Sequence, residues 1–374
     1  MSRRFLVGAL VVLVSVLVAG CGGGGSKSSE GETGGEGAKK KVTLQLKWVT
    51  QAQFAGYYAA KAKGYYDEEG LDVNIKVGGP SITPEQVVLG KQAQFGIDWL
   101  PSLLAARDQG QDLVNIAQVF GKSGMTELTW KTSGITTIPQ MRSKKVGVWC
   151  CGNENELYAA LNKNGMNPKS DVTIVNQPFD MNLFLNNQVD AAAAMTYNEL
   201  AQVLETTNPK TGQLYKPSDL NIISMESVGT GMLEDGIFVR GDWISDKDNQ
   251  ETAKKFLAAS FKGWVYCRDH VNECTQIVLN NGPTLGKGHQ TWMMNEINAL
   301  TWPAPKGIGV MDKAAYDRTA KIAQDFKVIK KAPSPDAYRT DLAQDAVDEI
   351  SAEGVDVNGD GYKKVKVKVT PKGT

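Results

Sequence analysis

Apolar and polar residues alternate at the start of the folded part of the chain and then change to helical spacing. The stretch KVTLQLKW places Val42, Leu44 and Leu46 on one face and predicts a strand that ends at Trp48. The following stretch, AQFAGYYAAKAKGYYDEEG, has apolar residues at helical spacing, and Gly64 interrupts it. A second strand is predicted over LDVNIKVGG. The chain therefore opens with a strand, a helix and a strand.

This order of strand and helix continues along the chain. TPEQVVLGKQ predicts a helix with Thr83 as its N-cap and Pro84 at the first helical position. Further strands are predicted over QAQFGIDW, LVNIAQVF, SKKVGVW and DVTIVNQ, and further helices over PSLLAARDQG, NELYAALNKNG and MNLFLNNQ. VDAAAAMTYNE predicts a strand that leads into a helix. Such alternation predicts mostly parallel sheets with helices on both faces.

The pattern restarts at SKKVGVW, and from IFVRGDWI onward the chain is mainly helical. Short strands near residues 128–130 and 237–239 are predicted to act as hinges between two units. We therefore predict an α/β fold with two lobes around a cleft, each lobe a mostly parallel sheet flanked by helices. The predicted ranges are 42–128 for the first part of lobe 1, 129–236 for lobe 2, 237–330 for the helical return to lobe 1, and 331–374 for a C-terminal extension.

The N-terminus has the features of an export signal. Arg3 and Arg4 precede an apolar run over residues 5–18, and small residues lead from there to Cys21. This pattern predicts a lipoprotein signal peptide over residues 1–20 and lipidation of Cys21. Residues 22–41 are rich in Gly, Ser, Glu and Lys and predict a flexible tether. We expect an exported protein, lipid-anchored on the outer face of the cytoplasmic membrane or facing the periplasm. Either the general secretory or the twin-arginine route would serve, with the first as the default.

The charge balance argues against nucleic acid as a partner. The chain carries 41 basic and 41 acidic residues, so the basic face that nucleic acid requires is not expected. After the signal peptide, no second apolar run in the sequence is long enough to predict a membrane span. We expect a water-soluble, monomeric body that holds no cofactor.

Four cysteines follow Cys21, and the predicted location outside the cytoplasm permits disulfides. Cys267 and Cys274 are seven positions apart, which is too far for a bridge within one helix. A break is predicted between them, with Asn272 as the N-cap of a new helix. We therefore expect a disulfide across a helix–turn–helix.

Cys150 and Cys151 are neighbours at a predicted strand end, where their side chains point to opposite faces. A disulfide between them would be strained, and the sequence leaves open whether they are bridged. The chain has only two histidines, His270 and His289, and neither is near a cysteine in sequence. Neither a zinc site nor a Cys–His nucleophile is therefore indicated. Packing beside a pocket is the simpler interpretation of the two cysteines.

Aromatic residues follow four of the predicted strands, and each has an amide or a carboxylate close by. Ligands of open α/β sheets bind outside the carboxyl ends of the strands. Indole and phenol rings with neighbouring amides and acids suit a neutral or weakly basic planar heterocycle, although each ring alone could be a core residue. The predicted ligand-binding residues are Trp48, Gln51, Tyr57, Asp98, Trp99, Trp149, Cys150, Gly152, Asn153, Glu154, Thr196, Tyr197, Asn198, Glu199 and Asp235.

Some of these positions allow other roles. Gly152 and Asn153 open a helix whose free amides could hold a phosphate or a carboxylate, but the nearby glutamates argue against a strongly anionic ligand. Glu154 and Glu199 could in principle be a glycosidase acid and base, although their spacing gives this no support. Asp235 either contacts the ligand or caps the return of the chain to lobe 1.

The C-terminal extension contains DVNGDG at residues 356–361, which matches the start of a calcium loop. The twelfth position of that loop is Val367, where calcium would require a glutamate. A tight turn between two strands, VDV and YKKVKVKV, is the simpler interpretation.

Several motifs together resemble the substrate-binding lipoproteins of ABC importers, in the branch that binds thiamine pyrimidine precursors, nitrate and alkylsulfonates. These motifs are the lipobox, which is the run of small residues that ends at Cys21, and the stretches LKWVTQAQFAGYYAAKAKGYYDEEGLDV, FGIDW, KKVGVW, CGNE, DAAAAMTYNE, EDGIFV and FLAASFKGWVYC. The resemblance implies a type II periplasmic-binding-protein (Venus flytrap) fold that closes on a small-molecule solute and delivers it to an ABC permease and its ATPase. The motifs GVW, GNE and TYNE look most like the branch that takes pyrimidine-type precursors.

Other solutes and roles are compatible with the same resemblance. The solute could be a riboflavin-like aromatic compound, a sulfonate or nitrate, and the cleft could belong to a sensory domain. The fungal thiamine-pyrimidine synthase shares the fold, but it consumes its own histidine and uses a cysteine-rich segment with iron. The segment after Asp190 has no cysteine and residues 51–57 have no histidine, so we expect a protein that is not an enzyme. The alternative is an enzyme in which Cys150 or Glu154 is catalytic.

Overall fold

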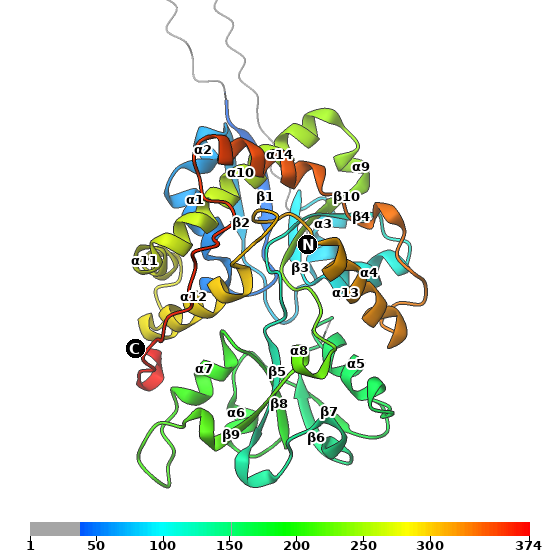
Figure 1. The fold of residues 1–374 in the computed structure, drawn as a ribbon, viewed down its shortest axis with the longest axis vertical. Coiled ribbons are helices and arrows are strands. Elements are labelled where there is room, and N and C mark those ends of the chain that lie inside the picture. The colour runs from blue at the N-terminus through cyan, green and yellow to red at the C-terminus, as the bar shows by residue number, and fades with distance from the viewer. Residues whose placement is uncertain (1–37, 151) are drawn as a thin grey trace, which may run out of the picture. The chain divides into compact units, whose positions relative to one another are not determined.

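Two five-stranded sheets organise the computed structural model, which describes residues 38–150 and 152–374 (Figure 1). The predicted signal peptide, Cys21, most of the predicted tether and Cys151 lie outside the described residues. The first sheet has the strand order β2 (Leu71–Lys76), β1 (Lys40–Gln45), β3 (Phe95–Asp98), β10 (Gly236–Arg240) and β4 (Leu113–Gln118). The second sheet has the order β7 (Thr173–Asn176), β6 (Lys145–Val148), β8 (Ala191–Met195), β5 (Met125–Trp130) and β9 (Leu220–Ser224).

Each sheet is parallel except for one strand. In the first sheet, β1 pairs in parallel with β2 and β3, and β10 runs antiparallel between β3 and β4. In the second sheet, β6 pairs in parallel with β7 and β8, and β5 runs antiparallel between β8 and β9. The predicted α/β fold with two mostly parallel sheets is therefore confirmed. We call each sheet with its helices a lobe.

The two strands that were predicted as hinges lie inside the sheets. Residues 128–130 belong to β5 of lobe 2, and residues 237–239 belong to β10 of lobe 1. The chain passes between the lobes in two irregular segments, 119–124 and 229–235, which we call the first and second crossovers. Pairing within a sheet satisfies the backbone N–H and C=O groups of β5 and β10, which an isolated hinge strand would leave without partners.

Helices surround both sheets (Figure 1). Those of lobe 1 are α1 (Ala55–Ala62), α2 (Tyr65–Glu68), α3 (Pro84–Leu89), α4 (Leu100–Asp108), α9 (Gly241–Ile244), α10 (Lys247–Asp269), α11 (Val271–Asn281), α12 (Lys287–Thr301), α13 (Lys313–Asp325) and α14 (Asp341–Ala352). Those of lobe 2 are α5 (Asn155–Lys163), α6 (Asn182–Leu185), α7 (Glu199–Leu204) and α8 (Met225–Val228). Short 3₁₀ turns occur at η1 (Ala52–Phe54), η2 (Lys131–Ser133), η3 (Ile138–Met141), η4 (Pro217–Asp219), η5 (Pro335–Ala337) and η6 (Pro371–Gly373).

Helix α10 fixes the position of the segment that follows β1. The helix begins where the side chain of Asp246 accepts a hydrogen bond from the backbone N–H of Asn249 at 3.0 Å. Its Trp264 is buried against α1. The two helices lie so close that a Cβ atom at Gly263 would come 2.1 Å from the carbonyl oxygen of Gly56, so a larger residue does not fit there. This packing holds α1 and the turn η1, which together support residues 48–54.

The C-terminal extension belongs to the core of lobe 1. Helix α14, which the sequence pattern did not indicate, buries Ala346 and Ile350 in the same apolar cluster as α10. The predicted strands VDV and YKKVKVKV do not form, although residues 363–370 are not helical. The backbone of Val365 pairs with a side chain and not with a strand. The side chain of Asn295 on α12 accepts from the N–H of Val365 at 3.0 Å and donates to its carbonyl at 2.9 Å.

The cysteine pair lies at the junction of α10 and α11. Cys267 and Cys274 form a disulfide with their Cα atoms 5.2 Å apart. The break between the helices lies at His270, within the stretch 268–272 where it was predicted, but the N-cap of α11 is His270 and not Asn272, because His270 leaves the helical conformation with ψ at 53°. Within residues 38–150 and 152–374, every helix is too short or too polar to cross a bilayer.

Candidate functional site

Side chains from both lobes line one cavity at the carboxyl ends of β1, β3, β6 and β8, where the topology of parallel sheets places ligands. The lining residues are Lys47, Trp48, Gln51, Gln53, Trp99, Trp149, Asn153, Met195, Tyr197, Asn198 and Glu199. The side chains leave space between them for little more than one water molecule. The side chains therefore nearly close the site.

Aromatic rings form the walls, and hydrogen bonds at their edges orient two of them. Trp48 of lobe 1 meets Trp149 of lobe 2 with ring centroids 6.3 Å apart. The indole N–H of Trp149 donates to the carbonyl of Pro178 at 3.0 Å, and that of Trp99 donates to Asp235 at 3.1 Å. Because these polar edges are satisfied outside the cavity, the rings can present apolar faces to a ligand.

A buried ion pair lies beside the aromatic wall of lobe 1. The ammonium of Lys47 contacts the carboxylate of Asp98 and lies 4.7 Å from the ring centroid of Trp99. Asp98 also accepts from the backbone N–H of Trp99 at 2.6 Å. Burial, followed by the nearby charge of Asp98, raises the pKa of Glu85 well above its usual range. The ammonium of Lys47 is paired with Asp98, so the described residues that line the cavity offer no unpaired cation to a strongly anionic ligand.

Amide side chains connect the cavity to Asp235. Gln51 donates to the side-chain oxygen of Gln53 at 2.6 Å, and Gln53 donates to Asp235 at 2.8 Å. Burial raises the pKa of Asp235 to about 6. Asp235 itself does not line the cavity, but it orients both Gln53 and the indole of Trp99. A ligand at this end of the site meets hydrogen-bonding groups whose directions are already fixed.

Glu199 is the acidic group of the cavity on lobe 2. Its carboxylate accepts from the backbone N–H of Met195 at 2.9 Å and from the side-chain amide of Asn198 at 2.8 Å. Burial outweighs these bonds and raises the pKa of Glu199 to about 7. Such a carboxyl group can share a proton with a weakly basic ring nitrogen near neutral pH, or accept from an exocyclic amine.

The structure brings eight of the fifteen predicted ligand-binding residues together at this cavity, and places the other seven elsewhere. The eight are Trp48, Gln51, Trp99, Trp149, Asn153, Tyr197, Asn198 and Glu199. The seven are Tyr57, Asp98, Cys150, Gly152, Glu154, Thr196 and Asp235. Three lining residues were missed, namely Lys47, Gln53 and Met195.

The residues outside the cavity have other contacts. Tyr57 turns into the core on α1, where its ring packs edge to face on Trp264 at 5.5 Å. The carboxylate of Glu154 accepts from the backbone N–H of Gly152 at 2.9 Å. Cys150 has an exposed side chain and is disulfide-bonded. Within the described ranges, no cluster of three or more His, Cys, Asp and Glu could hold a metal ion.

Comparison with known proteins gives consistent matches. Residues 51–274 match the family described as "NMT1/THI5 like". A "Putative thiamine biosynthesis protein" of Haemophilus influenzae is 23% identical over 82% of this chain and 93% of its own length. The "Riboflavin-binding protein RibY" of Chloroflexus aurantiacus is 24% identical over 76% of this chain and 80% of its own length.

Relatives named as enzymes are also present. The "4-amino-5-hydroxymethyl-2-methylpyrimidine phosphate synthase THI11" of Saccharomyces cerevisiae is 26% identical over 60% of this chain and 66% of its own length. The expectation that the chain is not an enzyme is therefore contradicted, because it was drawn from missing histidine and cysteine residues while the chain remains similar to named synthases.

Solved structures share the two-lobed fold. The aliphatic sulphonate binding protein SsuA of Escherichia coli has a TM-score of 0.60 at 13% identity, covering 82% of this chain and 91% of that protein. The nitrate-binding protein NrtA of Synechocystis has a TM-score of 0.50 at 17% identity, covering 89% of this chain and 92% of that protein. These likenesses confirm the predicted periplasmic-binding-protein fold class.

Proposed function

Because the chain belongs to the NMT1/THI5-like family, we propose that it binds a planar nitrogen heterocycle, such as a pyrimidine precursor of thiamine, between its two lobes. The observation that carries this proposal is the convergence of Trp48, Trp149 and Tyr197 on one cavity from separate strands of both lobes. A flat ring can stack on these faces while its edge bonds to the amides and to Glu199. Binding groups on both lobes give the ligand a preference for the closed arrangement.

The size and charge of the cavity favour a single ring. A ligand must move apart the side chains that nearly close the cavity, and a substituted pyrimidine requires less displacement than a three-ring flavin. Lys47 is neutralised by Asp98, and Glu199 adds acidity, so a sulfonate or nitrate would meet no unpaired positive side chain among the lining residues. The relatives named for thiamine biosynthesis and for pyrimidine phosphate synthesis support the same class of compound.

The proposal includes a place outside the cytoplasm. The lipobox and Cys21 would anchor the protein to the membrane, and the bound solute would pass to an ABC permease and its ATPase. This part depends on the N-terminal sequence and on the two-lobed fold shared with solute-binding proteins of importers.

Tryptophan fluorescence provides a direct test, because three indoles line the cavity. Purified protein is titrated with 4-amino-5-hydroxymethyl-2-methylpyrimidine, riboflavin, an alkylsulfonate and nitrate. We expect saturable quenching with the pyrimidine and weaker or no response with nitrate and the sulfonate. Mass spectrometry of the recovered ligand then shows whether the protein returns the compound unchanged or converts it. Saturable binding of nitrate or sulfonate with no response to either heterocycle would overturn the proposal.

A further inference from the structure

The C-terminal part of the chain connects the two lobes outside the cavity. After α14 it passes along α12 of lobe 1 and reaches the turn η6 beside α7 of lobe 2 (Figure 1). We call residues 363–374 the C-terminal strap. Near its start, Lys364 forms an ion pair with Glu296 of α12 at 2.6 Å, and Val365 makes its two hydrogen bonds with Asn295. The first part of the strap is therefore bound to lobe 1.

The last part of the strap contacts lobe 2. Val369 packs on the apolar cluster of lobe 2 that includes Leu200 and Leu204 of α7. The backbone N–H of Lys372 donates to the carbonyl of Glu205, just beyond α7, at 3.0 Å. Lys372 has a left-handed backbone conformation with φ at 57°, which costs free energy for a residue with a side chain and persists only where its surroundings hold it. The turn η6 is therefore held in a specific conformation against lobe 2.

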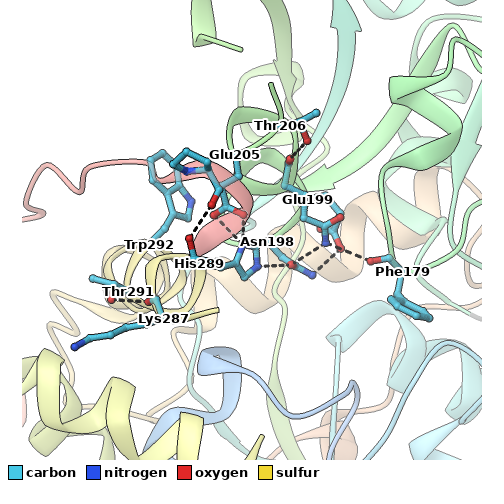
Figure 2. Close-up of polar contacts among 12 residues, drawn as sticks. Phe179, Asn198, Glu199, Glu205, Thr206, Lys287, His289, Thr291 and Trp292 are labelled. Carbon is cyan, nitrogen blue, oxygen red and sulfur yellow. Dashed lines mark hydrogen bonds and ion pairs between the residues drawn. The ribbon is translucent and has the colours of Figure 1, made fainter. Parts of the chain in front are cut away.

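Two side chains of α12 contact the same region of lobe 2 (Figure 2). The indole N–H of Trp292 donates to the backbone carbonyl of Thr196 at 3.0 Å, and the ring of His289 lies 3.0 Å from the side-chain oxygen of Asn198. The segment 195–199, to which both lobe 2 residues belong, supplies four of the residues that line the cavity. Trp292 and His289 do not line it. Lobe 1 therefore contacts the ligand-binding segment of lobe 2 from outside the cavity.

The middle of the strap is less tightly bound. Residues 366–369 make no backbone–backbone hydrogen bond with any other described residue, and the two lysines among them are exposed to solvent. This part can therefore change its conformation as the lobes separate, without loss of such a bond. The contacts of Val369, Lys372 and Trp292 with lobe 2 would be lost in the same movement. These contacts therefore favour the closed arrangement of the lobes.

We propose that the C-terminal strap and Trp292 hold the two lobes together from outside the cavity, so that they favour closure before the ligand binds and slow ligand release afterwards. Trp292 is a positioning residue in this arrangement, because it acts on the ligand through the segment 195–199. The effect on release rests on the proposed function, since it requires a ligand in the cavity. The effect on closure does not, since the contacts of Trp292, Val369 and Lys372 lie outside the cavity.

Two variants remove these contacts separately. Deletion of residues 367–374 removes the contacts of the strap with lobe 2 and leaves the bonds of Val365 with α12 in place. Trp292→Phe keeps an aromatic ring at the lobe 2 cluster but removes the indole N–H. Its matched control is Trp130→Phe, because Trp130 packs on the same cluster and its buried indole N–H has no hydrogen-bond partner among the described residues.

Small-angle X-ray scattering tests the effect on closure without a ligand. We expect the ligand-free deletion variant to have a larger radius of gyration than the wild type, and Trp292→Phe to show a smaller increase in the same direction. The wild type and Trp130→Phe are expected to agree. A ligand-free deletion variant with the radius of gyration of the wild type would overturn the inference that the strap favours closure.

Stopped-flow tryptophan fluorescence tests the effect on release, after dilution of the complex with 4-amino-5-hydroxymethyl-2-methylpyrimidine. We expect the rate constant of release to increase about tenfold in the deletion variant, which loses a hydrogen bond and an apolar contact, and about threefold in Trp292→Phe, which loses one hydrogen bond. Trp130→Phe should release the ligand as the wild type does. The affinity should decrease by no more than the same factors, because closure of the ligand-free protein also weakens.

Urea denaturation separates this role from a purely structural one. A strap that only completes the fold would lower the free energy of unfolding when deleted, but it would leave the release rate and the radius of gyration unchanged. That combination would overturn the inference. If no heterocycle binds the wild-type protein, the proposed function fails, and the scattering result alone decides whether the strap favours closure.

Discussion

Trp48 of lobe 1 and Trp149 of lobe 2 meet edge to face across the cavity, with ring centroids 6.3 Å apart and ring planes at 72°. The two residues follow β1 and β6, which belong to different sheets. Because the space between the side chains admits little more than one water molecule, a planar ligand must separate the two rings to enter. The same pair therefore closes the site in this structure and would hold a bound ligand between its rings.

Removal of one of these rings should weaken ligand binding. We expect Trp149→Ala to decrease the affinity for the pyrimidine by about 10- to 100-fold, because stacking of a base on an aromatic side chain contributes about 1–3 kcal/mol. Isothermal titration calorimetry measures the change without relying on the removed fluorophore. The control is Trp130→Phe, since Trp130 stacks on Phe184 within lobe 2 and does not line the cavity. Equal affinities of Trp149→Ala and Trp130→Phe would contradict the role of the indole.

The buried ion pair gives a prediction about stability. Lys47→Met leaves the carboxylate of Asp98 buried with no ammonium beside it, and loss of one partner of a buried pair typically costs about 3–5 kcal/mol. We expect urea denaturation to show a decrease of that order in the free energy of unfolding. The double variant Lys47→Met with Asp98→Asn should recover a large part of the loss, because it removes the unpaired charge. A double variant that is no more stable than Lys47→Met would show that the ion pair is not the cause.

The aromatic part of the site could be predicted from the sequence because Trp48, Trp99, Trp149 and Tyr197 each follow a strand with a clear apolar pattern. Parallel topology then places strand ends at one edge of a sheet without any knowledge of side-chain packing. Lys47 was missed because the alternating pattern puts it on the face opposite to Val42 and Leu44, where a lysine is ordinarily exposed to solvent. Only the pairing of β1 with β3 brings Asp98 beside it.

Other parts of the site depend on contacts that sequence spacing does not encode. Tyr57 and Gln53 are four positions apart, yet the ring of Tyr57 lies in the core and the amide of Gln53 lines the cavity. The packing of α1 on α10 sets this difference. His289 is 91 positions from Asn198, and it contacts lobe 2 only because α12 lies beside α7. Hinges were predicted at residues 128–130 and 237–239, which lie in β5 and β10. An apolar pattern does not distinguish a strand that pairs within a sheet from a strand that connects two lobes.

Two buried carboxyl groups, that of Glu234 on the second crossover and that of Glu156 on α5, should make stability depend on pH. The hydroxyl of Ser123 lies 2.7 Å from Glu156 and 2.9 Å from Glu234. Burial raises the pKa of Glu156 to about 8 and that of Glu234 well above its usual range. The single hydroxyl proton can satisfy only one carboxylate at a time, so a protonated carboxyl group fits the arrangement.

The sign of the effect follows from these raised pKa values. Between about pH 4.5, where an unfolded glutamate loses its proton, and about pH 8, the folded protein holds a proton on Glu156 that the unfolded chain has released. The free energy of unfolding should therefore decrease as the pH rises through this window, by up to about 1.4 kcal/mol per pH unit. Glu156→Gln, which carries no charge, should reduce this decrease and exceed the wild type in stability at about pH 9. Parallel slopes for the two proteins in urea denaturation would contradict the prediction.

Contact between the lobes at Gly152 should control closure. Gly152 has φ at +102°, and an added Cβ atom would come 2.3 Å from Oγ of Ser102 on α4 of lobe 1. Gly152→Ala is therefore expected to disfavour the closed arrangement and to weaken pyrimidine binding by about tenfold, since the overlap with the opposite lobe costs about 1 kcal/mol or more when the lobes are closed. Gly165→Ala is the matched control, because Gly165 also has a positive φ of +68° but has no atom within 4 Å of the added Cβ. Ser102→Ala in combination with Gly152→Ala removes the closest overlap and should restore part of the affinity. If Gly152→Ala binds the ligand as Gly165→Ala does, the overlap with Ser102 does not limit closure, and the lobes must approach each other differently when the ligand is bound.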